Sequence, residues 1–239
     1  MLKIENLTKM YGNYAAVDHL NLHIQPGEIY GFIGHNGAGK TTTLKSVVGI
    51  LPYDEGEIYI NGISAKSHPL EAKRIMAYIP DNPDLYDFMT GIQFLNFVAD
   101  IFGVSQEERE AKIMKYADMF ELTDKLADPV NSYSHGMQQK LAVMSALVHS
   151  PKLILMDEPF VGLDPVAAHL LKQTMREICD QGGAIFFSTH VLEVAEKLCD
   201  KIAIIKQGKL IKSGTMEEVK GDASLEDVFL ELEADNQKE

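Results

Sequence analysis

The chain has 239 residues, enough for one large α/β domain or two small ones, and its apolar fraction of 46% is ordinary for a protein with a buried core. The formal charge is −13 with no basic block to offset it, which argues against binding along a nucleic acid. Two cysteines argue against a disulfide framework, and no apolar run reaches the roughly 18 residues of a membrane helix.

The first quarter of the chain is predicted to be rich in β-strands. Apolar and polar residues alternate in the segments 2–7, 16–24, 28–34 and 56–62, a pattern that favours half-buried strands. Asn61–Gly62 ends the last of these segments and predicts a turn.

The middle of the chain is predicted to be helical, from about Thr90 to His149. Apolar residues recur at helical spacing in the segments 90–103 and 105–122. Ser105 and Glu108 have the spacing of a capping box at the start of the second helix.

The following segments predict a β-α-β unit. Residues 152–157 and 184–189 are apolar runs typical of buried strands, and the helix between them has Pro165 near its start and glycines at its end. Residues 201–214 predict a hairpin about Gln207–Gly208. The acidic residues after Leu232 are expected to form a frayed tail.

A phosphate-binding loop is predicted between the strand at 28–34 and a helix that starts near residue 39. The string matches G-x-x-x-x-G-K-[ST], in which glycines turn backbone amides toward a phosphate and the lysine reaches the β- and γ-phosphates. A flexible glycine turn is the alternative, but the strand before it and the helix after it favour phosphate binding. The predicted nucleotide-binding residues are Gly34, His35, Asn36, Gly37, Ala38, Gly39, Lys40, Thr41 and Thr42.

Polar residues follow both buried strands of the β-α-β unit. Asp157 at the end of the first strand can hold Mg²⁺, and Glu158 can accept a proton from an attacking water. His190 follows the second strand, at the edge where ligands bind in open α/β sheets, and could hydrogen-bond a γ-phosphate. Acids that merely end a strand, and an incidental histidine, are the alternatives.

The base is predicted to be adenine, because no Asn/Thr-Lys-x-Asp string is present to bind guanine. Tyr11 is a candidate to stack on the base, since an aromatic face binds any purine ring. A tyrosine packed under a turn fits the same spacing equally well.

The phosphate loop, NSYSHGMQQK, LILMDEP, GLDP and His190 occur in this order, and with them the chain resembles the ATP-binding-cassette (ABC) ATPases over residues 1–230. It most resembles the ATPase subunits of bacterial exporters whose permease is a separate polypeptide. The resemblance implies an α/β fold: a P-loop NTPase core with an N-terminal antiparallel β-subdomain and a helical insert at about 84–150. It also implies one domain, residues 1–232, and an acidic tail, residues 233–239.

The resemblance implies a role for each matching position. Tyr11 resembles the adenine stacker, Gly34–Thr41 the Walker A loop, Asp157 the Walker B aspartate and Glu158 the catalytic base. Asp164 resembles the D-loop residue that links the two sites of a dimer, and His190 resembles the switch histidine. The implied cofactors are ATP and Mg²⁺, with Thr41, Asp81 and Asp157 at the metal.

Two segments depart from the family pattern: in the first, His135 replaces a glycine and Met137 a glutamine. Residues 133–137 are YSHGM where the family has LSGGQ, so Ser134, His135 and Gly136 would face the ATP of the opposite subunit. A serine that only caps its own helix is the alternative. Asp81 stands where the family usually has glutamine, and its charge is less favourable near phosphates, although a carboxylate can still ligand Mg²⁺.

The implied function is an ATP-driven clamp of two cassettes, identical or not, that closes on two ATP molecules and drives a separate transmembrane permease. This places the chain peripherally, at the cytoplasmic face of the cell membrane. The segment 84–102 is expected either to dock a helix of the permease or to fill the core. Two other functions are weighed: an ATP-binding regulatory module without turnover, and a soluble ABC ATPase unconnected with transport, which would need a basic surface.

Overall fold

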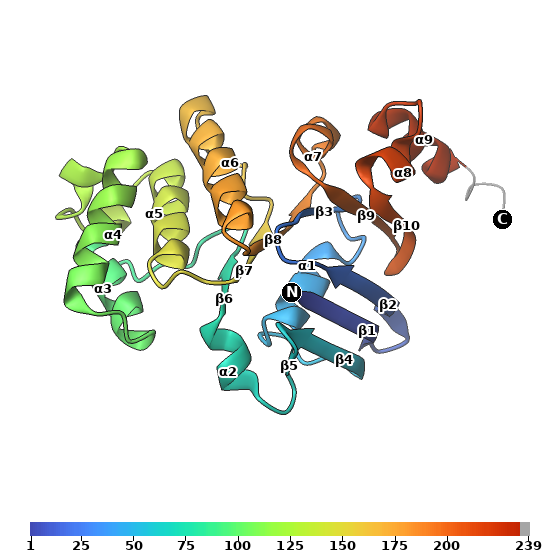
Figure 1. Ribbon diagram of the computed structural model, residues 1–239, viewed down its shortest axis with the longest axis horizontal. Helices are drawn as coiled ribbons and strands as arrows, with labels where there is room; N and C mark the ends of the chain where they lie inside the picture. Colours follow the sequence, from blue (N-terminus) through green and yellow to red (C-terminus); the bar gives the residue numbers. More distant parts are fainter. Residues whose placement is uncertain (235–239) are drawn as a thin grey trace.

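The computed structural model describes residues 1–234, with the side chains of residues 1–232. Two β-sheets and the helices around them form an α/β fold (Figure 1). The helix at the end of this range includes residues 233 and 234, where the acidic tail is predicted to begin, and residues 235–239 of that tail lie outside the described part.

The smaller sheet is antiparallel, as the resemblance implies. Its strands lie in the order β2-β1-β4-β5. Asn61 and Gly62 both have positive φ, 49° and 80°, which makes the two-residue turn between β4 and β5 a type I′ turn, as the Asn-Gly pair predicts. The strands are β1 (Leu2–Tyr11), β2 (Tyr14–Ile24), β4 (Glu55–Ile60) and β5 (Ile63–Ser64).

The larger sheet is mixed and has the order β10-β9-β3-β8-β7-β6. All neighbours run parallel except β10 and β9, which form the predicted hairpin about Gln207 and Gly208. Because the parallel strands point the same way, their carboxyl ends meet at one edge of the sheet. The strands are β3 (Ile29–Ile33), β6 (Met76–Ile79), β7 (Leu153–Asp157), β8 (Ala184–Thr189), β9 (Lys201–Lys206) and β10 (Lys209–Thr215).

Helices α3, α4 and α5 gather at one end of the molecule, and α8 and α9 lie near the other end (Figure 1). None of the helices within residues 1–234 is long and apolar enough to cross a membrane. The helices are α1 (Lys40–Val47), α2 (Pro69–Arg74), α3 (Gly91–Ile101), α4 (Gln106–Met119), the 3₁₀ turns η1 (Thr123–Lys125) and η2 (Val130–Ser132), α5 (His135–Leu147), α6 (Pro165–Asp180), α7 (Leu192–Leu198), α8 (Met216–Lys220) and α9 (Leu225–Ala234).

The capping box predicted at the start of α4 is half formed. Ser105 Oγ accepts a hydrogen bond from the Glu108 amide at 3.3 Å, as predicted. The Glu108 carboxylate instead pairs with Lys112 one turn later, so the reciprocal bond to the Ser105 amide is missing. An i,i+4 lysine competes for the same carboxylate, and the sequence pattern alone does not rank the two partners.

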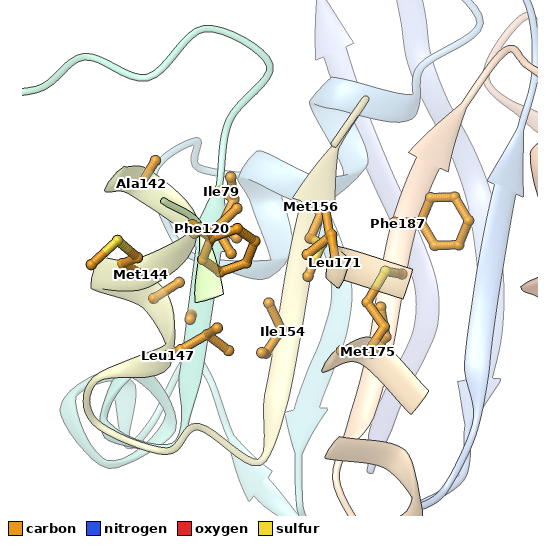
Figure 2. Close-up of a cluster of buried hydrophobic side chains, with 14 of the residues drawn as sticks. Ile79, Phe120, Ala142, Met144, Leu147, Ile154, Met156, Leu171, Met175 and Phe187 are labelled. Carbon is orange, nitrogen blue, oxygen red and sulfur yellow. The ribbon is translucent and has the colours of Figure 1, made fainter. Parts of the chain in front are cut away.

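Strand β7, next to the edge strand β6, separates two apolar cores. Ile154 and Met156 face the core that contains α5 and α6, whereas Leu153 and Leu155 face the core under the antiparallel sheet. Figure 2 shows Ile154 and Met156 between side chains of α5 and of α6. Because both faces of the strand are packed, a shift in its register would disrupt the fit of its side chains in both cores, so the position of Asp157 at its end is well determined.

His149 joins three elements at the helical end of the molecule. Its ring stacks on Phe102, just after α3, with centroids 3.6 Å apart, and its Nε2 lies 3.2 Å from the Met76 carbonyl oxygen of β6. Among the side chains of residues 1–232 and the backbone described, the buried Nδ1 finds no hydrogen-bond partner. Burial lowers the pKa of His149, an effect to which Lys112 adds. The folded state therefore favours the neutral imidazole.

We predict that His149 makes the fold less stable in mild acid. Below its ordinary pKa near 6.5 the unfolded histidine binds a proton that the folded one resists, so the free energy of unfolding falls as the pH drops from about 7.5 to 5.5. His149→Gln keeps an amide donor for Met76 but does not titrate, and should show a shallower pH dependence in urea unfolding. Equal pH dependences would contradict the prediction.

Candidate nucleotide-binding site

The predicted phosphate loop connects β3 to α1 and is held by close backbone contacts at both ends. A Cβ on Gly34 would lie 2.5 Å from the Ile205 carbonyl oxygen, and a Cβ on Gly39 would lie 2.4 Å from that of Ala16. Gly39 also has φ of 110°, which side chains rarely allow. Glycine is therefore required at these two positions of the motif for steric reasons.

The loop opens onto a cavity of about 310 Å³ at the carboxyl edge of the large sheet. The cavity brings together predicted residues from distant parts of the sequence, and adds Tyr14 and Ala16, which the sequence analysis missed. Its lining residues are Tyr11, Tyr14, Ala16, His35, Asn36, Gly37, Gly39, Lys40, Thr41, Thr42, Asp81, Asp157 and Glu158.

The Asp157 carboxylate accepts hydrogen bonds from two hydroxyl groups at the site. Thr41 Oγ1 donates to Asp157 Oδ2 at 2.6 Å, and the buried Ser188 Oγ donates to Asp157 Oδ1. Asp81 lines the same cavity from an exposed position after β6. These oxygen ligands suit Mg²⁺. The sequence analysis missed Ser188, although Ser188 and Thr189 are hydroxyl residues at the end of a strand that is otherwise apolar.

Lys40 lies folded onto the loop that precedes it. Its Nζ donates to the carbonyl oxygens of Gly34 at 2.6 Å and His35 at 3.2 Å, and lies 3.8 Å from Glu158 Oε1. Burial lowers the pKa of Lys40, and the charges of Glu158 and Asp157 act in the opposite direction. The ammonium group thus lies between the loop and the acids, where a triphosphate could bind it.

Glu158 and His190 lie next to each other at the carboxyl edge, as their positions after β7 and β8 predict. His190 Nδ1 lies 2.9 Å from Glu158 Oε1, an ion-pair distance that lacks hydrogen-bond alignment. The Glu158 backbone has φ of 47°, a costly conformation for a residue other than glycine, and its amide donates to the Ser188 carbonyl oxygen at 3.2 Å. With this backbone conformation, Glu158 lines the cavity.

Tyr11 and Tyr14 face each other at the end of the β1–β2 hairpin and are 52% and 53% exposed. Tyr11 is therefore not packed under a turn, which was the alternative interpretation. Lys9 Nζ lies 5.4 Å from the centroid of the Tyr11 ring and 3.4 Å from Asp54 Oδ2. Because Lys9 lies over one face of the Tyr11 ring, the opposite face can stack on a base at the cavity.

Ser134, His135, Gly136 and Asp164 do not line this cavity. Ser134 is exposed and caps α5, accepting a bond from the Met137 amide at 3.3 Å. The His135 ring lies so close to Gly162 that a Cβ there would be 2.6 Å from its Cδ2.

Asp164 caps α6 through the Ala167 amide at 2.9 Å and pairs with Lys140 of α5 at 3.0 Å. The Ala167 bond and Lys140 lower the pKa of Asp164. The starts of α5 and α6 therefore form a second polar surface, apart from the cavity.

Comparison with known proteins identifies the family. A family model described as "ABC transporter" matches residues 17–161. The linearmycin resistance ATP-binding protein LnrL of Bacillus subtilis (strain 168) is 33% identical, over 90% of this chain and 69% of that protein.

Two solved structures resemble the whole fold. The structure of an ATP-binding subunit of an ABC transporter superimposes with a TM-score of 0.93 at 34% identity, covering 97% of this chain and 99% of that one. A dimeric, post-hydrolysis state of the ATP-binding cassette MJ0796, bound to ADP and Pi, gives a TM-score of 0.81 at 25% identity, covering 90% and 99%. The chain belongs to the ATP-binding subunits of ABC transporters.

Proposed function

We propose that the protein hydrolyses ATP between two cassettes and thereby drives a separate transmembrane permease, in the direction of export. One observation carries this proposal: Lys40, Thr41, Asp157 and Glu158 line one cavity beside the phosphate loop. Ser188 and His190 do not line it, but Ser188 bonds Asp157 and His190 pairs with Glu158. Together they offer charge for phosphates, oxygen ligands for a metal and a base for water, the three requirements of phosphoryl transfer.

Thr41, Asp157 and Asp81 would hold Mg²⁺, which neutralises phosphate charge when it is bound. Lys40 exchanges the carbonyl oxygens of Gly34 and His35 for the β- and γ-phosphates, and Tyr11 stacks on adenine. Glu158 accepts the proton of the attacking water, and His190 holds the γ-phosphate from the same edge. In the MJ0796 structure, ADP and Pi are bound to a homologous cassette, which supports hydrolysis here.

The second polar surface supports an arrangement with two cassettes. Ser134 presents its hydroxyl and the start of α5 to solvent, away from the chain's own phosphate loop. Backbone amides and the helix dipole at this end favour a phosphate. The MJ0796 cassette is dimeric. We infer that a second cassette, identical or not, brings its triphosphate to this surface.

An exposed aromatic cluster between β6 and α3 supports a permease partner. Phe88 is 78% exposed and Tyr86 is 46% exposed, and the Tyr86 ring lies 5.7 Å from Phe88 and 5.5 Å from Phe97. Exposed apolar clusters of this kind mark protein interfaces. Docking here would hold the chain peripherally at the cytoplasmic face of the membrane, and the resistance function in the name of LnrL supports export.

The Glu158→Gln variant tests the catalytic base. An amide cannot accept the proton of water, so phosphate release should fall by a factor of about 10² to 10⁴ while ATP still binds. An ATP-bound dimer should then accumulate and elute early in size-exclusion chromatography. A variant that stays monomeric with ATP, even with the permease present, would contradict the clamp.

The Ser134→Ala variant separates phosphate binding from helix capping, because Ser105 provides a matched control. Each serine accepts one amide bond at 3.3 Å at the start of its helix, so each alanine variant should lose about 1 kcal/mol of stability. Only Ser134→Ala should also lower turnover, by about ten- to a hundredfold, the effect of one lost bond to a charged group. If the Ser134→Ala and Ser105→Ala variants have equal turnover, Ser134 serves only as a helix cap.

The Phe88→Ser variant tests the docking surface, with Leu70→Ser as a control of similar exposure, 78% against 75%. Phe88→Ser should lose co-purification with a multi-span membrane protein from detergent-solubilised membranes, because it removes an apolar contact from the interface. Leu70→Ser should retain it, and the ATP affinity of both isolated variants should be unchanged. Retention of the partner by Phe88→Ser would contradict docking at this cluster.

A further inference from the structure

The last described helix, α9, touches the phosphate loop. The ring of Phe229 packs edge-on against the ring of His35, with centroids 4.9 Å apart and planes at 65°. His35 is the second residue of the loop motif and lines the nucleotide cavity. A segment near the end of the chain thus contacts the loop that is expected to hold the triphosphate.

The helix that carries Phe229 is firmly placed. Phe229 is 8% exposed and belongs to the core that includes the faces of α7 and α8. Ser224 and Asp227 bond each other reciprocally at its start: Ser224 Oγ donates to Asp227 Oδ2 at 2.6 Å and accepts from the Asp227 amide at 3.1 Å. Near its end, the Leu232 carbonyl oxygen accepts a bond from Lys206 of β9 at 3.4 Å. Phe229 therefore offers a fixed surface to the loop.

The contact falls on the exposed part of the loop. The Ala38 carbonyl oxygen accepts a bond from the Gly208 amide at 2.9 Å, and Gly39 is packed against Ala16, so the second half of the loop is held by other strands. His35, Asn36 and Gly37 are exposed. The His35 carbonyl oxygen is also one of the two that bind Lys40 Nζ. The contact of Phe229 with His35 therefore involves a residue whose backbone carbonyl binds Lys40, the lysine expected to bind phosphate.

We propose that α9 positions the phosphate loop through Phe229, so that ATP affinity depends on the docking of the C-terminal helix. Phe229 is a positioning residue, since it acts through His35 and does not line the cavity. The proposal rests on ATP binding at this loop. An edge-on ring pair changes an equilibrium constant by up to roughly tenfold, and we expect an effect of about three- to tenfold on affinity.

The test measures Mg-ATP affinity of the full chain by calorimetry for wild type, Phe229→Leu and Val228→Ala. Val228 is the matched control, because it is on the same helix and equally exposed, 8%, but makes no ring contact with the loop. Phe229→Leu keeps an apolar side chain and removes the ring, and should raise the Kd about three- to tenfold. Val228→Ala should leave the Kd within about twofold of wild type, although both variants lose some stability. Equal Kd values for the two variants would overturn the proposal.

A double-variant cycle distinguishes positioning from loss of packing. His35→Ala should raise the Kd by itself, and adding Phe229→Leu to it should have little further effect, because both remove the same contact. Additive effects would overturn the proposal. Turnover at saturating ATP should change less than the Kd in every variant.

Hydrogen exchange of the wild-type protein provides a test that needs no variant. If Phe229 favours the loop conformation that binds ATP, then ATP must stabilise the docked α9 to the same degree, since coupling is reciprocal. Amides of α9 should exchange more slowly with a non-hydrolysable ATP analogue, and unchanged exchange would count against the coupling. If the wild-type protein fails to bind ATP, the proposed function is overturned as well. If it binds ATP and the Phe229→Leu and Val228→Ala variants have equal Kd values, only the coupling is overturned.

Discussion

Two backbone contacts, at Gly34 and Gly39, join the sheets of this protein at the nucleotide site. Gly34 packs on Ile205 of β9 in the large sheet, and Gly39 packs on Ala16 of β2 in the antiparallel sheet. Since neither position has space for a Cβ, any other residue would push a sheet away from the loop. Tyr11 approaches the cavity only because the hairpin that carries it is held there.

The hydrolytic half of the site is a product of strand register. β7 and β8 pair in parallel with Asp157 opposite Ser188, so the carboxylate meets a buried hydroxyl, and the next residues, Glu158 and then His190 two positions on, emerge at one edge. The two apolar cores on either face of β7 hold that register. Apolar packing away from the nucleotide site therefore determines the distances from Asp157 to Ser188 and from Glu158 to His190.

The polar residues at the starts of α5 and α6 form one unit. Lys140 and Asp164 tie the two helices together, and the His135 ring rests on Gly162. His135 stands where the family's signature usually has its first glycine. Gly162, just before α6, leaves space for its ring. Movement of one of these helix starts must carry the other with it, which links this surface to the segment that follows Glu158.

The sequence by itself determined the phosphate loop and the strands that end in Asp157 and Thr189, because these depend on local periodicity and on steric rules that act within a few residues. The full fold class came from the resemblance that these motifs carry. It also predicted the turns at Asn61–Gly62 and Gln207–Gly208. It did not predict the competition of Lys112 for Glu108, or the contributions of Tyr14 and Ser188 to the site. Those depend on which partners the folded chain brings within reach.

Only the tertiary structure decided that Tyr11 is exposed at the cavity, that Lys140 of α5 pairs with Asp164 of α6, and that Phe229 meets His35. Each of these facts joins residues far apart in the chain, and a local pattern carries no record of such contacts. They follow from the packing of the two sheets and the last helix around a single loop.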